Sequence, residues 1–319
     1  MLSEFDLIAK YFTRPTRHAT LGVGDDCALL TPTPGMQTAI SCDMLVSGTH
    51  FFADTDPKLL GHKSLAVNLS DLAAMGAKPV AFTLALALPK ADEPWLAAFA
   101  DGMLALADLH GCELIGGDTT RGPLNICITV FGEVPVGQAL QRSAAQVGDD
   151  IWVSGSLGDA RLGLAGLRKE VALDQETLSA ALTRLQQPMP RVALGIALRG
   201  VAHAAIDVSD GLIGDLGHIL DRSGVGASLN VDLLPFGPML AEQPQDIQRR
   251  FALAGGDDYE LCFTAPTAAR SAVVNAGNQT GKAVTRIGRI EAAAGLRLQD
   301  AAGQPVALDV ASFDHFGAS

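Results

Sequence analysis

Apolar and polar residues alternate along this 319-residue chain with both helical and strand periods, so the pattern predicts a mixture of the two elements. In the first half it predicts helices over 3–12, 57–75 and 92–109, and strands over 38–43, 80–88, 112–115 and 125–133. In the second half it predicts helices over 157–168, 175–186, 191–199 and 212–222, and strands over 151–154, 204–208, 227–231, 260–264 and 284–290.

A polar stretch at 137–147 interrupts this pattern and predicts a domain boundary, with domains at 1–147 and 148–319. Neither half repeats strand–helix–strand units strictly. We therefore expect an α+β fold in which mixed sheets are flanked by helices, rather than one doubly wound parallel sheet.

Composition narrows the classes of function. The formal net charge of −12 argues against nucleic-acid binding, which needs a basic surface. No apolar stretch is long enough to cross a bilayer, and the first residues lack the features of a signal peptide, so we expect a cytoplasmic protein without a membrane partner. The five cysteines contain no CxxC motif, and we interpret most of them as reduced core residues.

Seven short acidic motifs stand out from this background, and most combine a carboxylate with glycine or serine. They lie at 24–26, 41–43, 68–71, 116–119, 149–150, 207–211 and 255–258. Glycine lets a backbone approach a ligand closely, and aspartate is a hard oxygen donor. The set therefore suggests a place where divalent cations hold a polyphosphate, although each motif alone also fits a turn or a helix cap.

Three of these motifs are the most informative. Asp71 interrupts an almost uncharged helix, and we expect it to face a polar site because a buried carboxylate needs partners. The glycine pair before Asp118 follows a predicted strand and would leave N–H groups open to a phosphate. Asp207 and Asp210 flank a strand-to-helix junction, where a plain N-cap would explain Asp210 but not both.

Other motifs are missing. The chain has no GxxxxGK[ST] loop, no kinase-type HRD motif and no GxSxG. Its histidines are not paired at metal-binding spacing, and His50 is a candidate for substrate contact that fits a structural role at least as well. We interpret Asp149–Asp150 as a plain turn at the domain boundary.

Taken in order, the motifs GVGDDCA at 22–28, AVNLSDLAAMGA at 66–77, IGGDTTRG at 115–122 and IDVSDGL at 206–212 resemble the thiamine-monophosphate kinase family. The resemblance extends from Glu4–Phe5 to the sequence FDHF at 313–316. It implies the two-domain aminoimidazole ribonucleotide synthetase-like fold. It also implies a homodimer through the first domain, which binds ATP and Mg²⁺, and transfer of the ATP γ-phosphoryl group to thiamine monophosphate.

The resemblance also assigns residues by their matching positions. Metal-binding positions are Asp26, Ser41, Cys42, Asp43, Asp71, Asp118, Asp207 and Asp210. ATP-contacting positions are Asp101, Gly117, Asp118, Arg142 and Ser209, and substrate positions are His50, Asp258 and Phe313. The chain departs from the family where Cys42 replaces an expected threonine and Asp257 an expected glutamate.

Because the acceptor is itself a phosphate, we expect direct, metal-assisted transfer without a side-chain nucleophile. Two alternatives stay open. One is another ATP-dependent enzyme of the superfamily, such as a cyclo-ligase or a selenophosphate synthetase. The other is a catalytically silent protein that binds nucleotide or metal.

Overall fold

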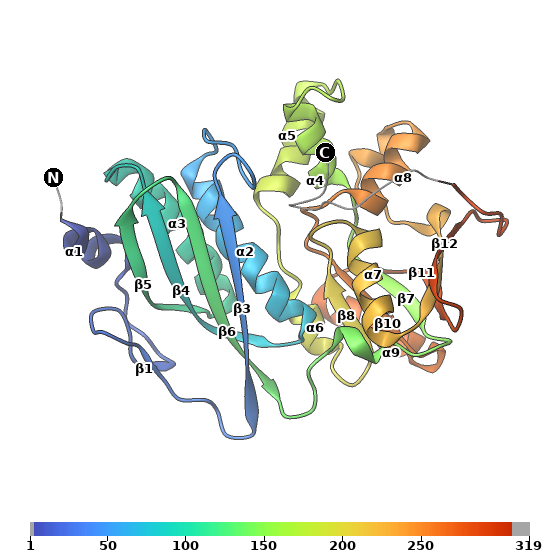
Figure 1. Cartoon of the computed structure of the whole chain (residues 1–319), viewed down its shortest axis with the longest axis horizontal. Helices are drawn as coiled ribbons and strands as arrows, with labels where there is room; N and C mark the ends of the chain where they lie inside the picture. Colours follow the sequence, from blue (N-terminus) through green and yellow to red (C-terminus); the bar gives the residue numbers. More distant parts are fainter. Residues whose placement is uncertain (1–2, 308–319) are drawn as a thin grey trace. The chain divides into compact units, whose positions relative to one another are not determined.

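The structure, a computed structural model, describes residues 3–307. Contacts divide the chain into two compact units (Figure 1). The first comprises residues up to 72 together with 77–137, and the second comprises 73–76 and the residues from 138 onward. The polar segment 138–147 thus groups with the second unit, ahead of the predicted boundary.

Up to residue 137, every predicted helix and strand is confirmed, with shifted ends. The elements are α1 (Glu4–Leu7), the π-helical turn η1 (Ile8–Phe12), β1 (Ala19–Leu21), β2 (Leu29–Leu30), β3 (Met36–Val46), α2 (Pro57–Ala74), β4 (Lys78–Leu88), α3 (Glu93–His110), β5 (Glu113–Arg121) and β6 (Asn125–Pro135). Helix α3 begins as expected at its N-cap Asp92, whose side chain accepts the Trp95 N–H, and it ends at Gly111 in a left-handed conformation.

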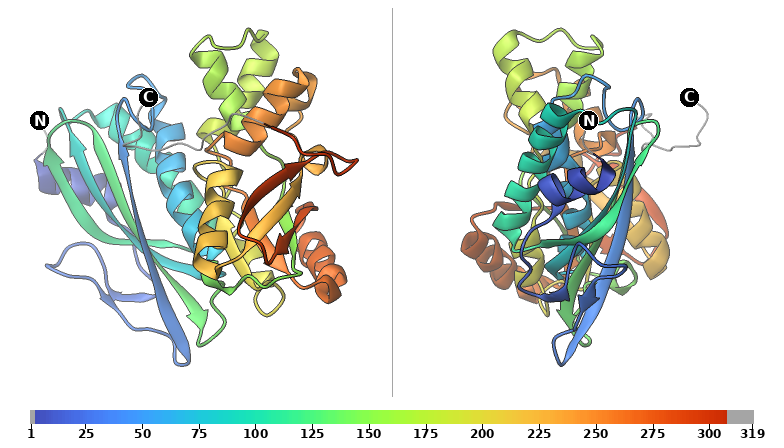
Figure 2. Two further views of the ribbon diagram at one scale, coloured as in Figure 1. Left: turned by 45° about the vertical axis from the view of Figure 1, so that its right-hand side comes forward. Right: turned by 90° about the vertical axis from the view of Figure 1, so that its left-hand side faces the viewer.

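Four strands of this unit form a sheet in the order β3-β6-β4-β5, in which β4 and β5 are parallel and the other neighbours antiparallel. Helices α2 and α3 lie on one face of the sheet (Figures 1 and 2). Leu72 of α2 lies so close to Gly132 of β6 that a Cβ there would come within 2.9 Å of it. On the opposite face, Ile40 and Met44 are 63% and 54% exposed.

The second unit confirms the predicted elements of its half and adds others. Its helices are α4 (Asp159–Leu167), α5 (Gln175–Gln186), α6 (Val192–Ala197), α7 (Leu212–Ser223), α8 (Gln245–Ala254) and α9 (Arg270–Thr280), with short 3₁₀ turns η2 (Arg142–Ala144), η3 (Val231–Leu233), η4 (Leu240–Glu242) and η5 (Thr267–Ala269). Its strands are β7 (Asp150–Ser154), β8 (Ala204–Asp207), β9 (Gly226–Asn230), β10 (Leu261–Ala265), β11 (Val284–Glu291) and β12 (Gly295–Gln299). The pattern did not predict α8, α9 and β12.

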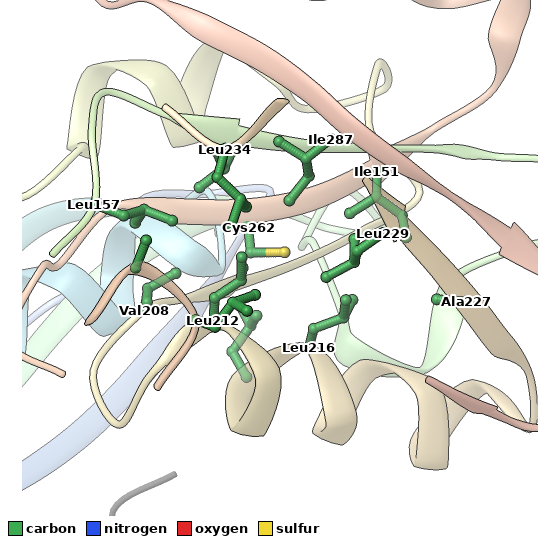
Figure 3. Packing of buried hydrophobic residues seen from close by; sticks show 14 of the residues in the cluster. Ile151, Leu157, Val208, Leu212, Leu216, Ala227, Leu229, Leu234, Cys262 and Ile287 are labelled. Carbon is green, nitrogen blue, oxygen red and sulfur yellow. The ribbon is translucent and has the colours of Figure 1, made fainter. Parts of the chain in front are cut away.

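The six strands form one sheet in the order β12-β9-β11-β7-β10-β8, with β12 parallel to β9 and the other pairs antiparallel. Leu216 of α7 is fully buried in the core that also contains Cys262 of β10 and Ile287 of β11 (Figure 3). This packing anchors α7 and β8, and so positions the loop between them that carries the IDVSDGL motif.

Candidate functional site

Two hydrogen bonds to side chains of α2 connect this helix with β3 in the first unit. The Ser41 hydroxyl donates a hydrogen bond to Oδ2 of Asp71. Two residues along β3, the Asp43 N–H donates to Oδ1 of Asn68 at 3.0 Å, and Asn68 is itself fully buried. The structure therefore brings Ser41, Asp43 and Asp71 into one neighbourhood, and Asp71 faces β3 as a partnered, half-buried carboxylate.

Asp118 belongs to a different part of the sheet. The strand predicted at 112–115 is longer, and 116–119 continues inside β5 instead of following it. In register, Asp43 pairs with Ile128, Ile128 with Leu84, and Leu84 with Gly117. Asp118 is one position further, so side-chain alternation places it on the opposite face from Asp43. It is exposed there.

A pocket lies beside Asp118 at the β5 edge of the sheet. Its lining combines apolar side chains with the glycine pair: Ile8, Phe12, Val23, Leu84, Leu114, Gly116, Gly117, Asp118 and Thr119. Gly117 has φ of 143°, and a Cβ on it would come within 1.8 Å of the Leu84 carbonyl oxygen, so only glycine fits. The pocket thus offers apolar walls and one carboxylate.

The structure gives local partners for three other candidates of this unit. Asp26 is exposed in a turn, where its N–H donates to Oδ1 of Asp25 at 2.9 Å. Nδ1 of His50 accepts the Val46 N–H at 2.9 Å, so a neutral His50 carries its proton on Nε2. Asp101 forms an exposed ion pair with Lys58 at 2.6 Å.

Cys42 is exposed, contrary to the expectation of core cysteines, which holds for Cys112 and Cys262. The sulfur atoms of Cys42 and Cys127 are 3.3 Å apart across β3 and β6. Burial, together with the neighbouring Cys42 thiol, raises the pKa of the Cys127 thiol to about 11. Both cysteines are free thiols.

In the second unit, the loop between β8 and α7 presents the predicted acids. Asp207 is buried at the end of β8, Ser209 is half-buried, and Asp210 is exposed. Helix α7 takes Gly211 as its N-cap, so the interpretation of Asp210 as a plain N-cap is wrong. The N–H groups of Ser209, Asp210 and Gly211 all donate to Oδ2 of Asp215, at 3.0, 3.2 and 3.1 Å.

Asp215 is a buried acid of this loop that the sequence motifs do not single out. Burial, and then the nearby Asp210 carboxylate, raise its pKa to about 7, against the lowering effect of the three N–H donors. One signal in the sequence would have found it. Asp215 lies beside Leu216 in the apolar stripe of a helix, the same feature that identified Asp71.

The segment before β10 is hydrogen-bonded to this loop. Asp257 and Tyr259 have φ of 66° and 49°, a left-handed conformation that costs free energy in residues with a Cβ. Their N–H groups donate to the carbonyl oxygens of Ser209 and Val208, at 2.9 and 2.8 Å. The strained backbone is therefore fixed by hydrogen bonds to the loop that carries the acids.

Asp258, a predicted substrate contact, is 7% exposed, and both of its oxygens accept the Gly158 N–H, at 2.9 and 3.0 Å. Burial raises its pKa well above the usual range. Phe313 lies outside the described residues.

Arg142 lies at the other end of α7 from Ser209. Its carbonyl oxygen accepts the hydroxyl of Ser223, the last residue of α7, at 2.9 Å. At 1.5 Å per residue, the 12 residues of α7 span about 18 Å. Arg142 and Ser209 therefore lie at opposite ends of α7.

Asp149 and Asp150 are not a solvated turn, because each is 3% exposed. Asp149 accepts hydrogen bonds from Thr264 and Gln146 and pairs with His203. Asp150 pairs with Arg270 at 2.6 Å. Both are structural groups of the second unit, and the prediction of a plain turn is wrong.

Within residues 3–307, no group of three or more His, Cys, Asp or Glu side chains is arranged to hold a metal ion. Mg²⁺ is usually held by one or two carboxylates together with substrate phosphates and water. The oxygen donors of Asp43 and Asp71, and those of Asp207 and Asp210, fit such sites. In the same described range, no helix is both long and apolar enough to span a membrane.

Comparisons with known proteins agree with one another. Residues 24–134 match the family "AIR synthase related protein, N-terminal domain", and 146–301 match its C-terminal domain. Thiamine-monophosphate kinases of Salmonella typhimurium and Escherichia coli K12 are 50% and 48% identical, each over 98% of both chains.

Solved structures give the same result. A thiamine-monophosphate kinase from Stenotrophomonas maltophilia has a TM-score of 0.85 at 49% identity, covering 91% of this chain and 92% of that one. The structure "AaThiL complexed with AMPPCP and TMP" has a TM-score of 0.78 at 28% identity, covering 90% and 89%.

Proposed function

This chain belongs to the thiamine-monophosphate kinase family, and on that premise we propose that it transfers the γ-phosphoryl group of ATP to thiamine monophosphate. The products are thiamine diphosphate and ADP. The observation that carries the proposal is near-complete coverage by relatives of that name at about half identity. The similar fold of a protein that holds AMPPCP and TMP together adds to it.

The chemistry needs two anions to meet. The acceptor is a phosphate oxygen that is already largely ionised, so the protein needs no strong general base. Mg²⁺, when bound, supplies the positive charge that screens the phosphates and stabilises the transferring group. The proposed ligands are Asp26, Ser41, Cys42, Asp43, Asp71, Asp118, Asp207 and Asp210, with Cys42 acting through its carbonyl oxygen because its side chain is a thiol.

The remaining predicted residues contact ATP or thiamine monophosphate in this proposal. The pocket beside Gly117 and Asp118 is the proposed ATP contact, because its apolar walls match a nucleobase and Asp118 supplies a carboxylate for a metal ion that ATP carries. Ser209, Arg142 and Asp101 are the further ATP contacts. His50, Asp258 and Phe313 stay predictions as thiamine monophosphate contacts.

We also propose a homodimer formed through the open face of the first sheet. Ile40 and Met44 are large apolar side chains that β3 leaves exposed on this face, and an interface would bury them. In this proposal Arg142 and Ser209 contact different parts of ATP, since about 18 Å of helix separates them. A cytoplasmic location stays a prediction.

The test is to incubate the purified protein with ATP, Mg²⁺ and thiamine monophosphate and to follow both products by chromatography. The kinase predicts thiamine diphosphate and ADP in equal amounts, and neither product without Mg²⁺. ADP or phosphate released without thiamine diphosphate would favour another ATP-dependent enzyme of the superfamily. No turnover despite nucleotide binding would favour a silent binding protein.

A further inference from the structure

The loop between β8 and α7 is built around one buried carboxylate. A single oxygen of Asp215, Oδ2, accepts the N–H groups of three consecutive residues, Ser209, Asp210 and Gly211. Such converging N–H groups at a helix N-terminus normally form a site for a phosphate or another anion. Here the protein fills that site with its own side chain, which is 3% exposed.

The carbonyl groups of the same loop are also occupied. The carbonyl oxygens of Val208 and Ser209 accept the N–H groups of Tyr259 and Asp257. The Val208 N–H in turn donates to the Glu260 carbonyl oxygen at 2.8 Å. The main chain of this loop is therefore held from both sides, while the Asp210 side chain stays exposed and that of Ser209 half-buried.

We propose that Asp215 is a positioning residue for the metal- and ATP-binding loop, and this rests on the proposed function. By holding three N–H groups on one oxygen, it sets the direction in which the Ser209 hydroxyl and the Asp210 carboxylate leave the loop. Asp215 touches neither ATP nor metal in this proposal. Its effect on the reaction passes through Ser209 and Asp210.

The test compares Asp215→Ala, which removes the acceptor, with Asp215→Asn, whose amide oxygen replaces it with little change of shape. Asp149→Asn is the matched control. Asp149 is equally buried and also accepts a backbone N–H, from Gln146, but it lies outside the proposed site. Three readouts are used: hydrogen exchange of the 209–211 amides, Mn²⁺ binding followed by the EPR signal of the free ion, and the KM for MgATP against kcat.

In Asp215→Ala we expect exchange at 209–211 to accelerate about tenfold or more, with Mn²⁺ affinity lower and the KM for MgATP higher by a similar factor. Asp215→Asn should retain Mn²⁺ affinity and KM within about threefold of the wild type. Asp149→Asn should leave all three readouts unchanged, even where it lowers the melting temperature.

Two results would overturn the proposal. If exchange accelerates in Asp215→Ala while Mn²⁺ affinity and KM stay at wild-type values, the carboxylate is only a structural cap. If Asp215→Asn loses Mn²⁺ as fully as the alanine variant, the charge itself acts on the metal and Asp215 is a ligand. Should the alanine variant fail to fold, Asp215→Ser takes its place with the same expected changes, because its shorter side chain does not reach the three N–H groups. If the wild type forms no thiamine diphosphate, the proposed function fails, while exchange and Mn²⁺ binding still report on Asp215.

Discussion

Replacing Glu260 with glutamine should destabilise the second unit severely, although the two side chains have nearly the same shape. Glu260 is fully buried, and its carboxylate accepts Nε of Arg191 at 2.5 Å as well as Nη2 of the same side chain. The Ser154 hydroxyl donates to it at 2.6 Å, and Arg184 completes the set at 3.2 Å. Glutamine would keep an oxygen in place but remove the charge.

The expected loss follows from what is left behind. The Arg191 side chain is 5% exposed, so without Glu260 it becomes a buried guanidinium that has lost its carboxylate. Breaking a buried ion pair in this way costs about 3–5 kcal/mol. The matched control is Glu291→Gln, which breaks an ion pair with Arg297 whose side chains are both 36% exposed. That change should cost less than about 1 kcal/mol.

Urea unfolding at neutral pH measures both values. The chain has two tryptophans, of which Trp152 lies in β7 of the second unit, so a Trp95→Phe background makes fluorescence report on that unit. The expected change is a lower midpoint at constant slope. A Glu260→Gln loss below about 1 kcal/mol, or one equal to that of Glu291→Gln, would refute the reasoning from burial.

Asp71→Asn and Asp210→Asn should each lower kcat by about 100-fold or more, because each removes a proposed metal-binding charge, while the melting temperature should change little. Near-normal formation of thiamine diphosphate by either variant would argue against that role. Transfer should be direct, so protein quenched after mixing with γ-labelled ATP should carry no label, and a trapped aspartyl phosphate would contradict this. The Arg270 guanidinium lowers the pKa of Asp150, so this pair stabilises the fold above the ordinary pKa of about 4, and its contribution is lost as pH falls through the lower folded value. Asp150→Asn should therefore flatten the acid dependence of urea unfolding below about pH 4, and an unchanged slope would show that the pair contributes nothing.

The periodic part of the fold was predictable because long apolar stripes and caps are local signals. Helix α5 begins and ends where the spacing predicts, at Gln175 and Gln186. Helix α9 was not predicted, because Val273 and Ala276 are the only apolar side chains that it buries. Its position depends on tertiary packing, which a local pattern does not contain.

In the candidate site, too, local features were predictable from the sequence and long-range contacts were not. Asp71 was identified by its apolar surroundings, and the structure gives it the polar partner Ser41. The partners of Glu260 could not be predicted, since Arg191 lies 69 residues before it in the chain. Asp149 and Asp150 resembled a turn because adjacent acids usually do, yet their partners Thr264 and Arg270 come from more than a hundred residues away. Long-range pairing of this kind leaves no local trace in one sequence.

In the loop after β8 and the segment that packs against it, the structure gives the glycines of the acidic motifs a packing role instead of a phosphate-binding one. The sequence suggests that they expose N–H groups to phosphates, but in the loop after β8 the N–H groups of 209–211 all bond to Asp215. A Cβ on Gly256 would come within 2.3 Å of the Ser209 carbonyl oxygen, so this glycine serves close packing of protein against protein. Phosphates at this loop must then be bound by side chains and by the metal ions they hold, unlike in a P-loop, where the backbone does this work. Ser209 has both of its main-chain groups occupied, which leaves its hydroxyl as the group for the proposed contact with ATP.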